Sequence, residues 1–280
     1  MLRSLSRITC SEEESNVLLQ GSYDGPSFFD LLRHDHAHLL PLQHLPQLSP
    51  GAADLSAATP FGTTVLALRF ADGIVIGGDR QATEGFEVSS RRIEKVYNAD
   101  DYSVIAIAGA AGPCLEMVKL FQIEMEHYQK IEGEVLVLEG KANKLAQMIR
   151  QNLPAAFQGL IVIPIFAGYD PNTQEGRIYK YDITGGRYDE RDFYSTGSGS
   201  REARSTLKKR FEPDMRRDAA VRLALEALVD AADLDVGTAG PDLHRGIYPV
   251  IKVVTKNGIE DVSEDELRPM SEALLAELKG

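Results

Sequence analysis

Tryptophan is absent from this chain of 280 residues, and cysteine occurs only twice, at Cys10 and Cys114. The two cysteines lie far apart in the sequence and fit neither a disulfide framework nor a metal-ligand spacing. Such sparse cysteine use is typical of proteins in the reducing cytoplasm, where we expect this chain to work. No apolar run approaches the roughly 20 residues of a membrane-spanning helix, so the sequence predicts no membrane anchor.

Basic residues are also in the minority, because 30 Lys and Arg are opposed by 42 Asp and Glu, which gives a formal net charge of −12. A domain that binds duplex DNA normally carries a basic patch, and none is visible in this sequence. The acidic balance therefore predicts solubility rather than nucleic-acid binding. Glutamates at positions 12–14 stand where the apolar core of a secretory signal would lie, so we expect no export signal.

The composition changes near residue 60. Residues 1–62 show no sustained hydrophobic period and contain apolar Leu/Pro clusters at 39–42 and 45–46. We expect weak intrinsic order in this segment, with a short helix near residues 28–33. The alternating His34, His36 and His38 could bind zinc, but only with a strand-like local shape and further ligands, so flexible-tail histidines are the favoured interpretation.

From Thr63 onward the hydrophobic pattern predicts regular secondary structure. Strands are expected at 64–70, 74–77, 103–108, 160–169, 177–183, 188–196, 249–255 and 259–262, with a loosely alternating stretch at 88–96. Helices are expected at about 113–128, 141–157, 201–211 and 216–232, and a last helix should begin after Ser263 with Glu266 as its capping-box partner. Pairs of helices between runs of antiparallel strands indicate layers rather than βαβ units. The pattern favours an α+β fold with two sheets face to face and helix pairs outside them.

Thr63, in Gly62-Thr63-Thr64, is the candidate nucleophile. A threonine hydroxyl needs an adjacent general base, and an N-terminal α-amine is one known solution. Such an amine titrates at about pH 7.7–8.0, so cleavage of the chain at Gly62–Thr63 would supply a well-matched base. Taken alone, the tripeptide favours the start of a β-strand over a nucleophile, because Gly-Thr-Thr is a common sequence.

Asp79 and Lys95 follow the candidate nucleophile along the chain. A buried ammonium close to Thr63 would lower the pKa of the hydroxyl and of the amine and would stabilise developing negative charge on oxygen. A buried lysine requires a partner, which Asp79 would provide. The alternative is a pair on the surface, since Arg92 and Glu94 are charged neighbours of Lys95.

Three further segments could contribute polar groups. Gly109 ends an expected buried strand, and its N–H could face a substrate carbonyl, although the same glycine could simply turn the chain toward a helix. Ser198 and the pair Asp235 and Thr238 lie in glycine-containing loops and could hold the amine of Thr63. These loops could equally be an ordinary helix entry and an ordinary helix C-terminus.

Together, the order and spacing of these elements resemble the β-subunit of the 20S proteasome in its bacterial, actinobacterial-type form. The resemblance runs from Thr63 to about Leu274. The matching elements are Gly62-Thr63-Thr64, Gly78-Asp79-Arg80, Lys95, Ile107-Ala108-Gly109, Thr196-Gly197-Ser198-Gly199 and the loop with Asp235 and Thr238.

The resemblance implies a threonine endopeptidase of the N-terminal-nucleophile hydrolases, with their four-layer αββα sandwich and no cofactor. Thr63 would be the nucleophile and its freed amine the base. The implied supporting residues are Asp79 and Lys95 as an ion pair, Ser198, Asp235 and Thr238 as holders of the amine, and Gly109 as the oxyanion donor. Residues 1–62 would be a propeptide that the chain removes by self-cleavage at Gly62–Thr63, which leaves 63–280 as the catalytic domain. Family members often have serine at the position of Thr238, and the hydroxyl is kept here.

The resemblance also implies a substrate site and partners. Thr83 would bind the substrate backbone as an added strand, and the adjacent pocket would be lined by Ala82, Ile93, Tyr97, Ile107, Ala111 and Leu115. This apolar lining predicts cleavage after apolar or aromatic residues. The family assembles as stacked seven-membered rings, with β rings inside and separate α-subunit rings outside. An ATPase ring delivers substrates, often tagged with a small ubiquitin-like protein; neither nucleic acid nor membrane is implied.

Two alternatives remain for the function. The small ATP-dependent chambered threonine protease of bacteria, the HslV type, also resembles Thr63-Thr64-Val65 and the stretch from Gly78 to Thr83. Its shorter chains and minimal propeptide argue against it. A non-catalytic structural ring subunit is the other alternative, and the intact set of Thr63, Asp79 and Lys95 argues against that.

Overall fold

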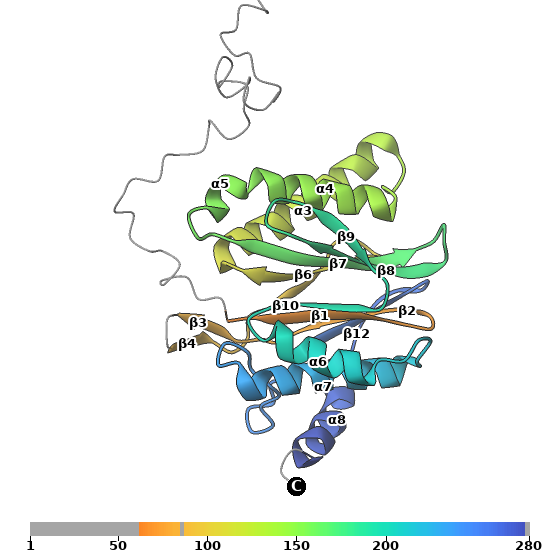
Figure 1. Cartoon of the computed structure of the whole chain (residues 1–280). Helices are drawn as coiled ribbons and strands as arrows, with labels where there is room; N and C mark the ends of the chain where they lie inside the picture. Colours follow the sequence, from red (N-terminus) through yellow and green to blue (C-terminus); the bar gives the residue numbers. More distant parts are fainter. Residues whose placement is uncertain (1–61, 85–86, 278–280) are drawn as a thin grey trace, which may run out of the picture. The chain divides into compact units, whose positions relative to one another are not determined.

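The computed structural model describes residues 62–84 and 87–277. The expectations for residues 1–61, namely the short helix, the histidine zinc alternative and Cys10, lie outside these described residues. Within them the chain forms two antiparallel five-stranded sheets and a separate two-stranded ribbon, with six helices (Figure 1). The class is therefore α+β, as the sequence predicts.

The first sheet has the strand order β10-β1-β2-β11-β12. Its members are β1 (Thr64–Phe70), β2 (Gly73–Gly78), β10 (Phe193–Gly197), β11 (Val250–Thr255) and β12 (Gly258–Asp261). The predicted turns at Asp72-Gly73 and Asn257-Gly258 join β1 to β2 and β11 to β12, because such dipeptides suit tight hairpins. The register of the first hairpin sets Asp79 beside Thr64, whose carbonyl oxygen accepts the N–H of Asp79 at 3.1 Å.

The second sheet has the order β5-β6-β7-β8-β9. Its members are β5 (Val96–Asn98), β6 (Ser103–Gly109), β7 (Val162–Asp170), β8 (Glu175–Tyr181) and β9 (Arg187–Glu190). The ribbon of β3 (Ala82–Glu84) and β4 (Glu87–Ser90) leads from the end of β2 toward Lys95. Every strand pair in both sheets is antiparallel.

The two sheets face one another through a shared apolar cluster. Alternate residues of β1 and β2 point into this cluster, where they meet residues of the second sheet. From the first sheet the cluster includes Val65, Ala67, Ile74 and Ile76, and from the second sheet it includes Val104, Ala106, Ile165 and Ala167. The intervening residues of β1, Leu66 and Leu68, point the other way and pack under helices. Because both faces of β1 are buried, its sequence reads as a continuous apolar run.

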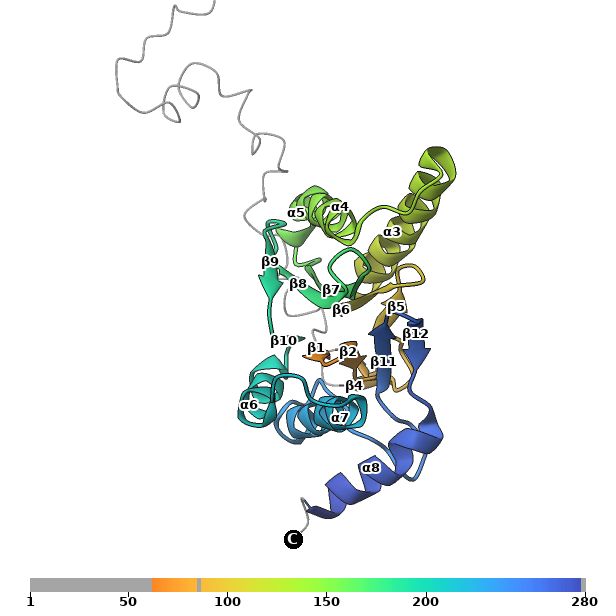
Figure 2. The ribbon, with the colours of Figure 1, turned by 90° about the vertical axis from the view of Figure 1, so that its right-hand side faces the viewer.

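Helices cover the outer face of each sheet (Figures 1 and 2). The second sheet is covered by α3 (Ala111–Glu132) and α4 (Leu138–Gln151), followed by the short α5 (Leu153–Ala156). The first sheet is covered by α6 (Ser200–Arg210) and α7 (Arg217–Leu234), and α8 (Glu264–Glu277) packs against α7. The expected helix at 141–157 breaks at Asn152, because Pro154 cannot continue the hydrogen-bond ladder.

One strand prediction is wrong. Residues 188–196 do not form a single strand, because the chain breaks at Arg191-Asp192 and changes sheets there. The first part becomes β9 on the edge of the second sheet, and the second part becomes β10, which pairs with β1 in the first. The N–H of Arg69 donates to the carbonyl of Asp192 at 2.8 Å, at the crossing point. This crossing brings Ser198 to the start of β1.

The spacing of apolar residues in 113–128 predicts an inner stripe of Leu115, Val118, Phe121 (with Leu120) and Met125 for α3, and this prediction is partly wrong. Leu115 and Leu120 are 42% and 48% exposed, while Cys114 and Met117 are buried beside the correctly placed Val118. The buried positions 114, 117, 118, 121 and 125 follow the period of an α-helix, and the two leucines lie one position away from that face.

The last helix begins as expected, since the N–H of Glu266 donates to Ser263 Oγ at 3.2 Å. The Glu266 carboxylate pairs with Arg217 instead of accepting the backbone N–H of Ser263, as the capping box predicts.

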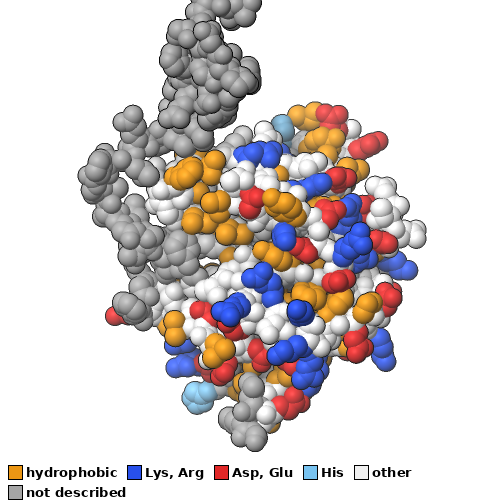
Figure 3. Space-filling model, viewed as in Figure 1, with side chains coloured by type: hydrophobic (Ala, Val, Ile, Leu, Met, Phe, Trp, Pro, Cys, Tyr) orange, Lys and Arg blue, Asp and Glu red, His pale blue; other side chains and the backbone are white. Residues whose placement is uncertain are grey.

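Among the helices in residues 62–84 and 87–277, none has the length and apolar character of a membrane span. Acidic and basic side chains are interspersed on the face in Figure 3.

Candidate active site

Thr63 precedes β1, and its side chain is largely buried, with 6% of the residue exposed. The peptide bond from Gly62 is intact, so the nitrogen of Thr63 is an amide, which donates to Ser198 Oγ at 3.2 Å. The Thr63 hydroxyl donates to the carbonyl oxygen of Gly62 at 2.6 Å. The hydroxyl therefore lies against the Gly62–Thr63 peptide bond, where the sequence analysis expects cleavage.

Lys95 and Asp79 form a buried ion pair beside this bond. Asp79 follows β2 and is 0% exposed, and Lys95 precedes β5 and is 5% exposed. The Lys95 ammonium lies 2.7 Å from Asp79 Oδ1 and also donates to the Gly62 carbonyl oxygen at 3.2 Å. One carbonyl oxygen is thus contacted by both the Thr63 hydroxyl and the Lys95 ammonium.

The carboxylate of Asp79 is held by four donors. In addition to Lys95, it accepts the backbone N–H groups of Thr64 at 2.9 Å, Gln81 at 2.9 Å and Ala239 at 3.3 Å. Burial raises the pKa of Asp79 and lowers the pKa of Lys95, and the contact between the two charges opposes both shifts. Backbone donors on both oxygens compensate the desolvation that a buried carboxylate would otherwise suffer.

A chain of hydroxyl groups extends from Ser198 into the loop after α7. Ser198 Oγ donates to the carboxylate of Asp235, which also accepts the hydroxyl of Thr238 at 2.5 Å. The hydroxyl of Thr238 lies 2.6 Å from that of Thr64. The nitrogen of Thr63 therefore contacts Ser198 directly, whereas Asp235 and Thr238 are linked to it only through Ser198 and Thr64.

Gly109 ends β6 in a conformation that favours glycine, with φ of +132°. A Cβ atom added there would lie 2.1 Å from the carbonyl oxygen of Ile161. Gly197 has φ of +103°, and an added Cβ would lie 1.9 Å from the carbonyl oxygen of Thr63. Both glycines allow backbone segments to approach one another closely, Gly109 at Ile161 and Gly197 at Thr63.

A cavity of about 200 Å³ opens at Gly62 and Thr63. It contains every residue that the sequence assigns to the substrate pocket, namely Ala82, Thr83, Ile93, Tyr97, Ile107, Ala111 and Leu115, together with Lys95 and Gly109. The lining also includes Gln81, Glu94 and Cys114, which the sequence analysis missed. Burial raises the pKa of Cys114 to about 12, so this thiol is neutral and adds to the apolar wall.

Gln81 and Cys114 could have been found from local signals. Gln81 lies two residues after Asp79, and its amide nitrogen donates to the carbonyl of Val236 at 2.8 Å, which ties the loop of Asp235 to the site. Cys114 lies one residue before Leu115 and on the buried face of α3. In the described part of the chain, no group of three or more His, Cys, Asp or Glu side chains could hold a metal ion.

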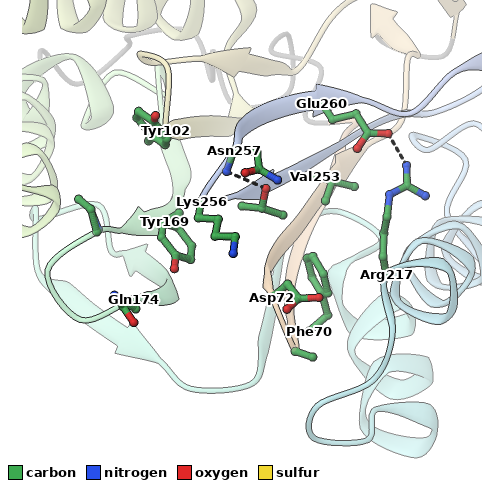
Figure 4. Close-up of a pocket in the computed structure, with 13 residues that line it drawn as sticks. Phe70, Asp72, Tyr102, Tyr169, Gln174, Arg217, Val253, Lys256, Asn257 and Glu260 are labelled. Atoms are coloured by element: carbon green, nitrogen blue, oxygen red, sulfur yellow. Dashed lines mark hydrogen bonds and ion pairs between the residues drawn. The ribbon is translucent and has the colours of Figure 1, made fainter.

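A larger cavity, of about 770 Å³, opens at the opposite ends of the same strands (Figure 4). It is bordered by Phe70 at the end of β1, by Tyr169 at the end of β7 and by the turn with Asn257. Its guanidinium, from Arg217, is already paired with Glu260 at 2.6 Å. Among the residues that line this cavity, no hydroxyl group contacts a buried charged group. Its greater volume therefore does not by itself make it the candidate active site.

The chain matches a known protein family over more than half of its length. The family model described as "Proteasome subunit" matches residues 60–241, which include Thr63, Asp79 and Lys95. A proteasome subunit beta of Acidimicrobium ferrooxidans is 50% identical over 247 residues, which is 88% of each chain. Proteasome subunits beta of Frankia casuarinae and Frankia alni are 47% and 46% identical over 251 residues, 90% of each chain.

These matches cover well over half of the chain at high identity. The subunits of that family assemble into a multisubunit complex, and its beta members are generally threonine peptidases. The chain belongs to the proteasome subunit family and is similar over most of its length to proteasome beta subunits.

Proposed function

We propose that this chain is a threonine endopeptidase, with Thr63 Oγ as nucleophile and the α-amine freed at Gly62–Thr63 as base. The observation that carries the proposal is the shared oxygen at Gly62, contacted by the Thr63 hydroxyl at 2.6 Å and the Lys95 ammonium at 3.2 Å. A hydroxyl lies against the carbonyl, and a buried cation polarises that carbonyl. These are the two requirements of an internal acyl transfer.

The first reaction is the self-cleavage that activates the enzyme. Thr63 Oγ attacks the carbonyl carbon of Gly62, the bond from that carbon to the Thr63 nitrogen breaks, and the nitrogen takes up the hydroxyl proton. This leaves an ester between Gly62 and Thr63 Oγ. Water then hydrolyses the ester, which gives a carboxylate on Gly62 and restores the Thr63 hydroxyl beside the amine freed in the first step. The Lys95 ammonium stabilises the negative charge that develops on the Gly62 oxygen.

The second reaction is peptide cleavage. The free amine accepts the Thr63 hydroxyl proton while Oγ bonds to the substrate carbonyl carbon, and that proton passes to the leaving nitrogen as the peptide bond breaks. Water then hydrolyses the acyl ester and restores the hydroxyl. Ser198, which already contacts the Thr63 nitrogen, holds the amine in place, with Asp235 and Thr238 behind it. Gly109 is our candidate for the oxyanion donor.

Residues 1–62 are then a propeptide, and 63–280 form the catalytic domain. The match to the A. ferrooxidans relative is longer than the whole stretch from Thr63 to Gly280, so part of the preceding segment is shared with it. Two facing sheets with helices outside them support the four-layer αββα sandwich of N-terminal-nucleophile hydrolases (Figure 1). As partners we propose the seven-membered β ring, the α-subunit rings, and an ATPase ring that delivers tagged proteins.

The cavity beside Thr63 would receive the side chain before the cut. Its walls are mainly aliphatic and aromatic and include the neutral Cys114 thiol, so we expect cleavage after apolar or aromatic residues. Among the alternatives, the non-catalytic ring subunit differs in a testable way, since it needs no intact nucleophile. The relatives matched here are beta subunits of proteasomes, which disfavours the HslV type.

The test is substitution of the nucleophile in the full chain, assembled with its partner subunits. Thr63→Ala should leave the peptide bond after Gly62 intact and abolish peptidase activity, because no hydroxyl remains to attack the carbonyl. Thr173→Ala, on an exposed turn between β7 and β8, is the matched control and should be processed and active. Peptidase activity in assembled Thr63→Ala particles would refute the proposal, and the non-catalytic alternative predicts no activity in either variant.

A further inference from the structure

A third cavity, of about 390 Å³, is lined by residues of β7, β10 and the start of α6. It shares Gly109 with the apolar cavity and is lined by Ser198, whose hydroxyl contacts the Thr63 nitrogen. Its other walls include Ile163 and Tyr194, and it reaches the first turns of α6 at Ser200 and Arg204. The two cavities thus share Gly109 and differ in the rest of their lining.

The two cavities can be assigned to the two sides of the bond that is cut, and this step rests on the proposed function. A peptide bond attacked by Thr63 Oγ has an acyl side and an amine side, and the apolar cavity at Ala82, Ile93 and Leu115 takes the acyl side. The amine side departs past the group that holds the free amine. Of these two cavities, Ser198 lines only the one of about 390 Å³, and we therefore assign this cavity to the residues after the cut.

The cavity of about 390 Å³ has a positively charged side chain in its lining. Arg204 is the one charged residue that lines it within the described part of the chain. Its Nε donates to the carbonyl of Ser200 at 3.2 Å, and its guanidinium lies 5.8 Å from the ring centre of Tyr194. These two contacts fix the side chain against the cavity without neutralising its charge.

A second cation near the cavity emphasises the difference. Lys180 also lies over the ring of Tyr194, at 5.1 Å, but its ammonium is paired with Glu190. Arg204 makes no ion pair with any residue in 62–84 or 87–277. In a chain with a net charge of −12, a guanidinium without a carboxylate partner beside a substrate cavity can attract acidic groups of a substrate.

We propose that Arg204 is a specificity residue that binds a carboxylate on the leaving-group side of the scissile bond, within the first positions after the cut. A guanidinium presents paired N–H donors that match a carboxylate. An acidic side chain at these positions is attracted, and a basic one is repelled. Because Arg204 is exposed, the effect is moderate and depends on ionic strength.

The test uses the full chain, assembled with its partner subunits and processed. Two internally quenched peptides share one apolar acyl side and differ only by Glu or Lys at the second position after the cut, with the cut site verified by mass spectrometry. A third substrate carries the same acyl side and a neutral fluorogenic amide with no residue after the cut. The ratio of kcat/KM for the Glu and Lys peptides is measured, and the third substrate reports the integrity of the nucleophile.

We expect the wild type to prefer the Glu peptide roughly two- to fivefold, with the preference falling as salt rises. Arg204→Gln should remove the preference, and Arg204→Glu should reverse it. The matched control is Arg201→Gln, which removes an exposed arginine of the same helix that does not line the cavity and should keep the wild-type ratio.

An unchanged Glu-to-Lys ratio in Arg204→Glu would overturn the inference. If the Arg204 variants fail to assemble, the wild type decides alone, since a ratio near one or a ratio that does not respond to salt also overturns it. Failure of the wild type to cleave any of the three substrates would count against the proposed peptidase instead.

Discussion

The two ends of β1 differ in whether the charged side chains beside them are buried or exposed. At its start, the ammonium of Lys95 and the carboxylate of Asp79 are buried, paired at 2.7 Å and surrounded by backbone donors. At its end, Arg217 is partly exposed and shared among carboxylates around a large open cavity. We propose that the end with the smaller cavity is the reactive one, because a buried cation acts more strongly on a nearby carbonyl than a hydrated one does.

Removing a lysine from each end should therefore have very unequal effects. Lys95→Met should slow self-cleavage at Gly62–Thr63 by a factor of about 10² to 10³, and with it the appearance of peptidase activity, since the charge that stabilises the Gly62 oxyanion is lost. It should also lower the free energy of unfolding by about 3–5 kcal/mol, because Asp79 is left buried without its cation. Lys256→Met, at the rim of the large cavity, should change stability by less than about 0.5 kcal/mol.

Peptidase assays and denaturant unfolding of the two methionine variants measure this contrast. Equal losses at both ends would show that burial of the ion pair is not the distinguishing feature.

A pair of glycines sharpens the comparison at the backbone level. Gly109→Ala should destabilise the fold by about 2–3 kcal/mol, since its positive φ and the carbonyl of Ile161 leave no room for a Cβ. Gly112→Ala, three residues later and inside α3, meets nothing within 4 Å and should stabilise the helix by about 0.5–1 kcal/mol. Thermal unfolding of both variants should give shifts of opposite sign, and shifts of the same sign would contradict the assigned backbone geometry.

The contact to the nucleophile nitrogen should matter less than the cation. Ser198→Ala should reduce kcat/KM roughly 10- to 100-fold, because the amine loses a hydrogen bond of about 1.5–3 kcal/mol. Ser205→Ala, an exposed serine of α6 outside both cavities, should retain wild-type kinetics. Steady-state assays with one apolar peptide decide the matter, and full activity in Ser198→Ala would remove Ser198 from the proposed machinery.

The smallest effect is expected at the outer part of the hydroxyl chain. Thr238→Ser keeps the hydroxyl that contacts Asp235 and Thr64, so kcat/KM should stay within about threefold of wild type. Thr238→Val has nearly the same shape without the donor and should lose roughly two- to tenfold. If valine and serine behave alike, the hydroxyl chain beyond Ser198 does not contribute to rate.

Much of the site could be predicted because it depends on local hairpins. Thr63 and Asp79 come together through the turn at Asp72-Gly73, which any short hairpin with that dipeptide would form. The apolar pocket follows from the alternation of β6 and from the first turn of α3. Every pocket residue expected from the resemblance lies in the cavity beside Thr63.

The remainder depends on contacts between distant parts of the chain. Residues 188–196 have the pattern of one strand, and only the pairing of β10 with β1 reveals that the chain changes sheets. The contact from Thr63 to Ser198 spans 135 residues and results from that crossing. Cys114 was missed because an error of one position rotates the predicted inner face of α3 by about 100°, which places Leu115 on that face instead of Cys114.

The central claim is that one peptide bond separates an inactive chain from an active one. Intact-mass measurement and N-terminal sequencing of the chain from active, assembled particles test it directly. The account predicts a single species that begins at Thr63. Active particles in which the chain begins at another residue, or retains residues 1–62, would contradict it.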